Sequence, residues 1–386
     1  MKRVLLVLLT LCMIFPLSAC ALFEAKEAGP ILPPEVHAHT YGEWQQVSAP
    51  TCSKDGVRKH TCECGTQELR MIPATGLHDY NDERICTVCG LTNPSEVEVE
   101  YVTLGEYPQT IKASKVTVSS TVDSRGYYLG SDGEYYAKVT AHLWHRSEYN
   151  NSKSSYAFTE GSVYKFSEGT TLKHGSSYYF KVEPIKWRVQ YSEDGVRTLI
   201  CESILDNAQF AEVTKNAEGE AVGSNNYKNS TIRTWLNETF MEKAFTPEEA
   251  ELIIGAMIDN SAASNSPDGK YNCDNTTDKV FLPSYQDMVN TKAGYNSDPT
   301  ISDDARTRVV TDYARACGTY YSNVAGTYGN GIYWLRSGAT KSFSVWCINS
   351  HGNANVARDV TKLSDSARGA YSGCYIGVVP AIRIAG

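Results

Sequence analysis

Cysteine and histidine are dense in residues 37–93, where their spacing is suited to holding a metal ion. Residues 86–90 read Cys-Thr-Val-Cys-Gly, a motif in which two thiolates reach one metal while the glycine relieves the turn. Cys62 and Cys64 are separated by one residue, so they can still bind a metal but without the usual knuckle geometry. The candidate ligands of a structural zinc ion are Cys52, Cys62, Cys64, Cys86, Cys89, His39 and His78.

The same segment is too small and too polar to fold by hydrophobic burial alone. A segment of about 60 residues with few Leu, Ile and Phe buries little apolar surface, so its fold needs stabilisation by a metal ion or by disulfides. Five of the 12 cysteines lie between Cys52 and Cys89, and five lie between Cys201 and Cys374. Because five thiols cannot all pair with one another, the odd number favours a metal over disulfides. Disulfides, or a degenerate repeat that has lost its site, are the alternatives.

An internal repeat runs through the cysteine-rich segment. His-Thr-Tyr-Gly at residues 39–42 is echoed by His-Asp-Tyr-Asn at 78–81, and a Pro-Ala-Thr-Gly turn at 73–76 lies between the copies. Together with Thr51-Cys52 and the two cysteine pairs, these features resemble the small zinc-ribbon-like repeats found in tandem on bacterial surface proteins. The resemblance covers most of residues 39–90. It implies a closed structural zinc site rather than a catalytic one.

The N-terminus carries the features of an export signal. Residues 1–3 are Met-Lys-Arg, and residues 4–17 are almost entirely apolar. This run is too short to span a bilayer comfortably, because a spanning helix needs about 20 residues. Residues 17–20, Leu-Ser-Ala-Cys, resemble the lipobox of bacterial lipoproteins, in which the cysteine is acylated and the chain is cut just before it. A plain secretion signal with an accidental cysteine is the alternative.

The lipobox resemblance implies a location for the protein. It predicts a signal peptide at 1–19, a lipid on Cys20 and a proline-containing tether at 20–36 that links the lipid to the first folded part. Several acyl chains hold a protein to a membrane where one would not. We therefore expect a lipoprotein of the cell envelope, anchored to a membrane and exposed outside the cytoplasm.

The overall composition argues against nucleic-acid binding. The chain has 36 Lys and Arg against 44 Asp and Glu, a formal net charge of −8, whereas nucleic-acid binding needs a basic surface. The 25 tyrosines, against 10 phenylalanines, suit an exposed recognition surface or half-buried strand positions, and both interpretations stay open. No segment after the signal peptide is apolar enough to cross a membrane.

Residues 99–386 have the pattern of one larger domain that begins with strands. Residues 178–182 and 185–189 are expected to form two strands on either side of Pro184. The second strand alternates with period two and turns back into 197–201 as a hairpin. Further strands are expected at 101–107 (ended by Pro108), 134–142, 162–166, 278–282, 331–336, 342–348 and 375–384.

Helical signals occupy the middle of this domain. Ser230 is suited to cap a helix, and Thr246-Pro247-Glu248-Glu249 is a capping box that opens a helix expected to run through Met257. A short helix is expected from Ser284, and another within residues 302–316. Strands at both ends with helices between them predict an α+β domain whose termini pair in one sheet.

Several strings in the large domain resemble a widespread uncharacterised domain of bacterial surface proteins. The final strands are also similar to the sheet core of the C-type-lectin-like fold, which the formylglycine-generating enzymes share. The resemblance implies a mixed lectin-like domain, with the long insertion at 111–175 as a departure from the pattern. The strings lie at residues 104–109, 184–189, 232–237, 278–282, 333–337 and 377–383.

The fold resemblance favours a binding module on the cell surface. Its expected ligand is a glycan or a surface protein, and an enzymatic role is less favoured than a binding role. The candidate contacts lie on the loop-rich final strands, although core packing is the favoured alternative for the two tryptophans. These candidates are Trp334, Arg336, Trp346, Asn349, His351 and Asn353.

Two alternatives to binding remain. A formylglycine-generating type of enzyme requires a close cysteine pair in a cleft, whereas Cys347 and Cys374 are 27 residues apart in the sequence. A purely structural envelope protein requires a surface without a pocket. The acids Asp274, Asp278, Asp303 and Asp304 lack the spacing of a calcium loop and are interpreted as turn and helix-cap residues.

Overall fold

The structure is a computed structural model that divides into two compact units, Met1–Gly76 and Leu77–Gly386. The predicted signal peptide, Cys20 and the tether lie outside the described residues, as do His78, Cys374 and the predicted module boundary at residue 93. The residues described are 38–52, 54–75, 79–80, 86–89, 99–143, 164–218, 221–360 and 375–386.

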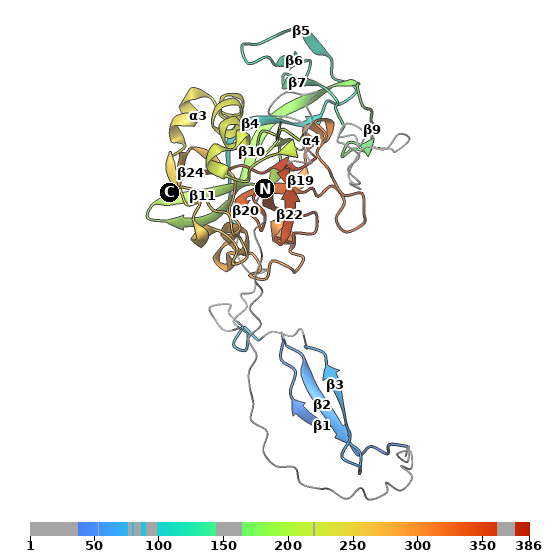
Figure 1. Cartoon of the computed structure of the whole chain (residues 1–386). Coiled ribbons are helices and arrows are strands. Elements are labelled where there is room, and N and C mark those ends of the chain that lie inside the picture. Colours follow the sequence, from blue (N-terminus) through green and yellow to red (C-terminus); the bar gives the residue numbers. More distant parts are fainter. Residues whose placement is uncertain are drawn as a thin grey trace, which may run out of the picture. The chain divides into compact units, whose positions relative to one another are not determined.

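The small unit is built on a three-stranded antiparallel sheet (Figure 1). In its register Val57 lies opposite Met71 and Lys59 opposite Leu69, so these four side chains share one face of the sheet. The alternate residues, which include His60, share the other face. The strands are β1 (Gln45–Ser48), β2 (Gly56–Thr61) and β3 (Gln67–Ile72).

The large unit contains an eight-stranded sheet in which a 17-residue strand, β10, pairs with three other strands. Both Pro184 and Pro108 lie inside a strand. Pro184 of β10 lies opposite Glu106, Pro108 of β4 lies opposite Val182, and each pair is next to a register irregularity that accommodates the proline. The two strands predicted around Pro184 are therefore one. The strands are β4 (Tyr101–Ile111), β5 (Val118–Val122), β6 (Tyr128–Gly130), β7 (Tyr135–Thr140), β10 (Ser177–Glu193), β11 (Val196–Cys201), β18 (Val280–Phe281) and β24 (Ala381–Ala385).

The two ends of the large unit meet in this sheet, as predicted. β4 pairs with β10, β10 forms the expected hairpin with β11, and β11 pairs with the C-terminal strand β24. Ile185 and Trp187 of β10 are fully buried, and the indole Nε1 of Trp187 donates to the carbonyl of Leu104 at 2.8 Å. The period-two pattern of this strand is therefore the pattern of a core-facing strand.

A second sheet carries the C-terminal strands and holds one side of the site described below. Its strand order is β13-β23-β20-β21-β22, with β20 and β21 antiparallel. All residues of β20 and β21 are buried. The strands are β13 (Asp206–Asn207), β20 (Tyr333–Gly338), β21 (Ser344–Ile348), β22 (Val356–Asp359) and β23 (Gly377–Val378).

The remaining strands of the described residues form four separate two-stranded pairs. The pair of β12 with β19 is parallel, and the other three pairs are antiparallel. They are β8 (Tyr164–Lys165) with β9 (Thr171–Leu172), β12 (Ser203–Ile204) with β19 (Val309–Val310), β14 (Thr214–Lys215) with β15 (Ala221–Val222), and β16 (Ala256–Ile258) with β17 (Thr276–Asp278).

The helices are short and begin at the predicted caps. Ser230 accepts a hydrogen bond from the backbone of Arg233, and Thr246 forms a complete capping box with Glu249. The second helix ends at Leu252 instead of running through Met257, because Ile253 forms a bridge with Ile384. The α-helices are α1 (Thr231–Trp235), α2 (Met241–Ala244), α3 (Pro247–Leu252) and α4 (Asp312–Ala316), and a π-helical segment η4 (Leu236–Phe240) joins α1 to α2.

The helix predicted within residues 302–316 is broken into pieces. Only a 3-10 turn at its start and α4 at its end are helical, and β19 lies between them. The interruption follows from burial of Arg308, whose Nε donates to the carbonyl of Cys201 at 2.9 Å beside the β12–β19 pair. The 3-10 turns are η3 (Tyr227–Asn229), η5 (Ala262–Ser264), η6 (Gln286–Val289), η7 (Thr291–Ala293) and η8 (Asp304–Arg306).

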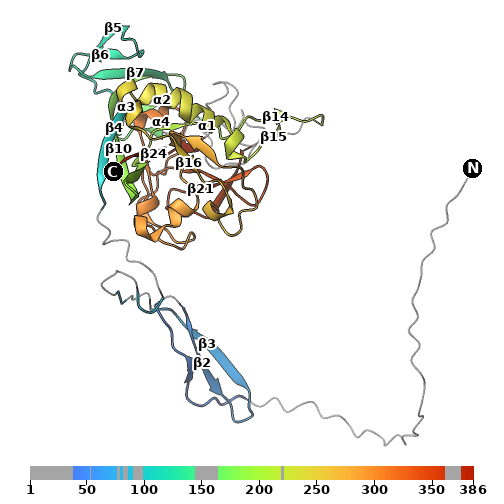
Figure 2. The same cartoon turned by 90° about the vertical axis from the view of Figure 1, so that its left-hand side faces the viewer.

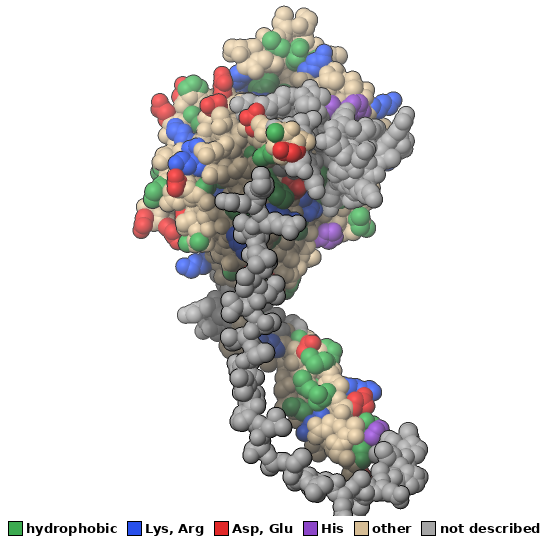
Figure 3. All heavy atoms as spheres, in the orientation of Figure 1, with side chains coloured by type: hydrophobic (Ala, Val, Ile, Leu, Met, Phe, Trp, Pro, Cys, Tyr) green, Lys and Arg blue, Asp and Glu red, His purple; other side chains and the backbone are tan. Residues whose placement is uncertain are grey.

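The fold is α+β with strands predominant, in agreement with the coarse prediction. Helices α2 and α4 contact β4, and Figure 2 shows the short helices gathered near strands β4 and β10. The main core is formed by side chains from Tyr107 to Ile382. Acidic and basic side chains are interspersed over the face of the large unit seen in Figure 3. No helix among the described residues is long and apolar enough to cross a membrane.

Candidate metal centre and ligand pocket

Three of the predicted metal ligands come together in the small unit. The ligand atoms of His39, Cys62 and Cys64 all lie within 4.8 Å of one another, and Nδ1 of His39 is 3.3 Å from Sγ of Cys64. With zinc bonds of about 2.3 Å to sulfur and 2.1 Å to nitrogen, tetrahedral ligands lie about 3.5–3.8 Å apart. The nitrogen and sulfur donors therefore fit three corners of a zinc site.

A tight turn positions this group despite its one-residue spacing. The amide of Gly65 donates to the carbonyl of Cys62 at 2.8 Å, and Gly65 has a φ of +89°. This φ lies in the left-handed region that glycine adopts without a steric cost. Cys62 is buried, whereas Cys64 and His39 are exposed. Gly65 thus permits the tight turn after Cys64, whereas Gly90 of the predicted motif lies outside the described residues.

The other three predicted cysteines are divided between the two compact units. Cys52 lies in the small unit, whereas Cys86 and Cys89 lie in the large unit. His78, a further predicted ligand, lies outside the described residues. The seven predicted ligands thus do not form a single set among the described residues. Sequence spacing alone did not indicate this division.

A stack of rings stabilises one face of the small sheet beside the candidate metal group. The imidazole of His60 stacks between Tyr41 and Trp44, with ring centroids 4.2 and 3.7 Å apart. Nε2 of His60 is 2.9 Å from a carboxylate oxygen of Glu68. The contact with His60, followed by that with Arg70, holds the pKa of the exposed Glu68 carboxyl below its usual value.

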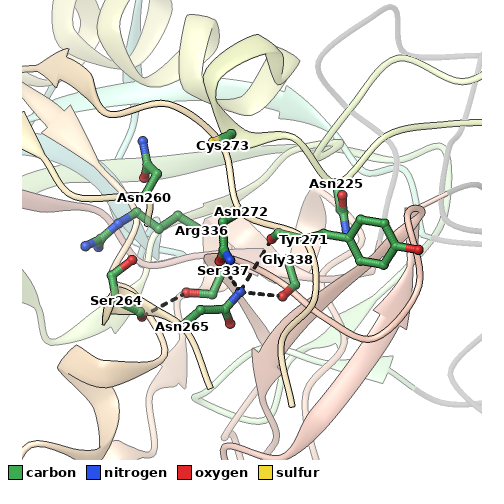
Figure 4. A pocket seen from close by; sticks show the side chains of 10 residues that line it. All are labelled: Asn225, Asn260, Ser264, Asn265, Tyr271, Asn272, Cys273, Arg336, Ser337 and Gly338. Carbon is green, nitrogen blue, oxygen red and sulfur yellow. Dashed lines mark hydrogen bonds between the residues drawn. The ribbon is translucent and has the colours of Figure 1, made fainter. Parts of the chain in front are cut away.

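A separate polar pocket opens in the large unit around the end of β20 (Figure 4). It encloses about 220 Å³, its open mouth included, and is closed in by loops that flank β16, η5 and β17. Amide side chains predominate in its lining, and Arg336 is the only charged residue among them. The lining residues are Asn225, Asn260, Ser264, Asn265, Tyr271, Asn272, Cys273, Arg336, Ser337 and Gly338.

Asn265 holds the wall of the pocket together. Its Nδ2 donates to the carbonyl of Gly338 at 2.8 Å and to Oδ1 of Asn272 at 2.9 Å, and it is 3.4 Å from the carbonyl of Tyr271 (Figure 4). A Cβ at Gly338 would lie 2.4 Å from that same Tyr271 carbonyl. Only glycine therefore lets the loop approach β20 closely enough to form the pocket.

Two further amides present acceptors to this region. Nδ2 of Asn225 donates to the carbonyls of Lys341 and Ser344 at 2.8 and 2.9 Å, which uses both amide hydrogens and leaves Oδ1 as an acceptor. Nδ2 of Asn260 donates to Asp274 and Thr276, while no described donor reaches its buried Oδ1. The pocket therefore suits a ligand that carries hydrogen-bond donors.

The charge of Arg336 is neutralised within the protein. Its Nη1 is 2.9 Å from Oδ2 of Asp287 and donates to the carbonyl of Leu282, and the side chain is only 7% exposed. Desolvation raises the pKa of Asp287, but Arg336 and the hydrogen bonds from Ser284 outweigh it, so this pKa lies below its usual value. The pair orders the floor of the pocket and leaves it without net charge.

The structure separates the six predicted ligand contacts. Arg336 lines the pocket, but Trp334 is fully buried and its Nε1 donates to the carbonyl of Ala208, so its ring belongs to the core. Trp346 is also buried. Asn349, His351 and Asn353 lie in the turn after β21. Oδ1 of Asn349 accepts hydrogen bonds from the backbone amides of His351 and Asn353 and so stabilises the turn.

The pocket asparagines were missed as a site in the sequence. Residues 260–275 are rich in Asn and Ser, and the sequence indicated turns there. In the structure the side chain of Asn275 accepts a hydrogen bond from the backbone amide of Asn260. Asp274 forms an ion pair with Lys228 at the surface. Asp303 is the N-cap of η8, as predicted for a cap residue. The local composition gave no sign that these turns converge on β20.

The comparisons with known proteins bear on the larger unit. Residues 194–385 match a family described as "Domain of unknown function (DUF6273)". The matched segment contains every residue of the pocket. No curated protein and no solved structure matches the chain.

Proposed function

We propose that this protein is a lipid-anchored binding protein of the bacterial cell surface, whose large unit binds a sugar residue of a glycan in the polar pocket. The observation that carries the proposal is the neutral, amide-lined pocket around Arg336. Ligand sites are concave and use a few convergent polar groups to orient their ligand. The family match describes no function, so the proposal rests on the chemistry of the pocket.

The polarity of the pocket favours a sugar over other small ligands. Its space of about 220 Å³ includes the open mouth, so the pocket would contact one side of a sugar residue and would not enclose the whole ring. Hydroxyl groups of the ligand would donate to the amide oxygen of Asn225 and accept from the amide nitrogen of Asn272. Tyr271, 38% exposed at the pocket, offers an apolar ring with a polar tip to the ligand. The absence of net charge among the lining groups disfavours an anion.

The C-type-lectin-like fold is part of the same proposal. Two features support it: the terminal strands β4 and β24 belong to one sheet, and a second small sheet carries the buried Trp-Leu-Arg-Ser segment of β20. In this proposal the loops around β20 form the binding surface, while the eight-stranded sheet is the scaffold. Binding residues commonly lie on loops that a rigid scaffold positions.

A glycan array tests the pocket. We expect the soluble chain without its signal peptide to retain a glycan that the Tyr271→Ala and Asn272→Ala variants bind at least about tenfold more weakly, because each loses a direct contact. Both side chains are exposed. Asn272→Ala also removes the acceptor for Asn265, so Tyr271→Ala is the variant that removes a ligand contact alone. Tyr328→Ala, which removes another exposed tyrosine, is the matched control. Equal binding by all three variants and the parent would contradict the proposal.

The lipid anchor is tested separately in cells. Cys20→Ser removes the acylated thiol, so we expect the variant to leave the membrane fraction and appear in the soluble fraction, as measured by fractionation and immunoblotting. Cys12→Ser, within the segment predicted to be removed, is the control and should fractionate like the parent. Retention of the Cys20→Ser variant in the membrane fraction would refute the anchor.

In this proposal a structural zinc ion is held in the small unit by His39, Cys62 and Cys64. Bound zinc would supply the folding free energy that the few buried apolar residues of this unit do not. Neither alternative to binding gains a supporting observation. Cys347 is buried and Cys374 lies outside the described residues, while the polar pocket argues against a purely structural protein.

A further inference from the structure

The two faces of the small sheet are unequal in how their side chains are covered. On one face the side chains cover one another, because Arg58 and Arg70 lie over the ring of Trp44 at 4.9 and 5.2 Å, and Trp44 stacks on His60. On the other face Leu69 and Met71 remain 64% and 62% exposed. Exposing two neighbouring large apolar side chains on one face of a sheet to water has an unfavourable free energy, and no other described side chain covers them.

The exposed apolar side chains form a continuous patch. Met71 lies opposite Val57 across the β2–β3 ladder, and Leu69 lies opposite Lys59, one pair further along the same face. Hydrophobic side chains are grouped on the small unit in Figure 3, with basic side chains beside them. We call Val57, Leu69 and Met71 the apolar patch.

The length of the tether limits how far the apolar patch can lie from Cys20. Residues 21–37 are 17 residues that separate Cys20 from the start of the described chain. A flexible chain of this length spans about 23 Å on average, and a fully extended proline-rich one about 53 Å. If Cys20 is acylated, the small unit stays within that distance of the bilayer. A short tether raises the effective concentration to about the millimolar range, at which a weak contact is populated.

We propose that the apolar patch docks onto the lipid surface to which Cys20 is anchored. Leu69 and Met71 would enter the boundary between headgroups and acyl chains, and the ammonium group of Lys59 would remain among the headgroups. The anchor and the patch then act as two linked contacts with the same bilayer. The inference rests on the proposed lipid anchor, and its test supplies an anchor chemically.

Methionine oxidation provides the readout. A soluble chain that begins with Cys20 can be ligated through its N-terminal thiol and amine to the thioester of a lipid with two acyl chains, and the product can be inserted into phosphatidylethanolamine–phosphatidylglycerol vesicles. After a short peroxide pulse, mass spectrometry compares oxidation of Met71 with that of Met257, which is 70% exposed in the large unit. On vesicles we expect oxidation of Met71 to slow by about tenfold relative to the unanchored chain, while Met257 is unchanged.

The controls separate docking from other causes of protection. In a Val57→Ser, Leu69→Ser variant anchored the same way, Met71 should be oxidised as fast as in solution. If Met71 is not protected on vesicles, or is equally protected without them because another part of the chain or a second copy covers it, the inference is wrong. Failure of the cellular anchor would appear instead as unchanged fractionation of Cys20→Ser, which the vesicle experiment does not depend on.

Discussion

Arg336 illustrates at the residue scale how burial defines a role. The sequence placed it among candidate ligand contacts, and the structure places it at the pocket with its guanidinium held by Asp287 and by backbone carbonyls. An arginine satisfied in this way orders the floor of a site and contributes little free charge. The side chains that remain for a ligand are neutral amides and a tyrosine, which is why the pocket favours a hydroxylated ligand.

Loss of the Arg336–Asp287 pair should destabilise the protein in a pH-dependent manner. Because the pKa of Asp287 is lowered in the folded state, the stabilisation is present above its ordinary pKa and is lost as the pH falls through the lowered value. We expect Asp287→Asn to reduce the free energy of unfolding by about 3–5 kcal/mol at pH 7, since it leaves a buried cation unpaired. The difference from the parent should shrink as the pH approaches 3, as measured by denaturant unfolding.

Asp274→Asn is the matched control for this prediction. Asp274 forms an exposed ion pair with Lys228 at 2.9 Å, where solvent screens the interaction. Its removal should leave the free energy of unfolding unchanged at every pH. A loss of stability in Asp287→Asn that does not vary with pH would show that the pair acts through packing alone.

The strands depend on glycine where elements approach closely. Gly105 in β4 has a φ of +71°, and a Cβ there would lie 2.6 Å from the carbonyl of Ala244 at the end of α2. The Gly105 amide also donates to Glu249 of α3 at 3.2 Å. This residue therefore fixes how the helices lie against the long strands of the main sheet.

We expect Gly105→Ala to cost about 3 kcal/mol of folding stability, because it combines a left-handed backbone with an overlap against backbone atoms. Gly126→Ala has the same backbone strain at a φ of +82° but no atom within 4 Å, and should cost about 1 kcal/mol. Chemical denaturation of the two variants separates strain from close packing. Equal costs would mean that the contact with α2 relaxes freely.

Whole-molecule behaviour should reflect two units with different sources of stability. The large unit has an extensive apolar core, whereas Cys52, Cys62 and Gly56 are the only buried residues among the described residues of the small unit. A metal-dependent fold is lost when the metal is removed. The two units should therefore respond differently to a chelator.

We expect a zinc chelator to abolish protection of the β1–β3 amides from hydrogen exchange while leaving β10 protected. Native mass spectrometry should show the accompanying loss of zinc, and Cys62→Ser should reproduce the effect without chelator. Cys273→Ser, outside the group of His39, Cys62 and Cys64, is the control. Unchanged exchange in β1–β3 after complete metal loss would contradict a structural role for zinc.

The elements whose signals are local were predictable from the sequence. The caps at Ser230 and Thr246 and the β10–β11 hairpin all form as expected, because each depends on hydrogen bonds or pairing between residues close in the chain. The helix predicted through Met257 ends early because Ile253 pairs with a strand more than 100 residues away. Long-range pairing overrides local helix propensity.

The sequence by itself determined the ligand types of the metal group, the α+β class and the meeting of both chain ends in one sheet. Only the tertiary structure decided which cysteines and histidines share a group, that Trp334 belongs to the core, and that the turns around Asn265 meet β20. The chemistry of a side chain and its short-range hydrogen bonds depend only on residues that are close together in the sequence. The convergence of distant turns depends on packing across the whole unit, which no local pattern encodes.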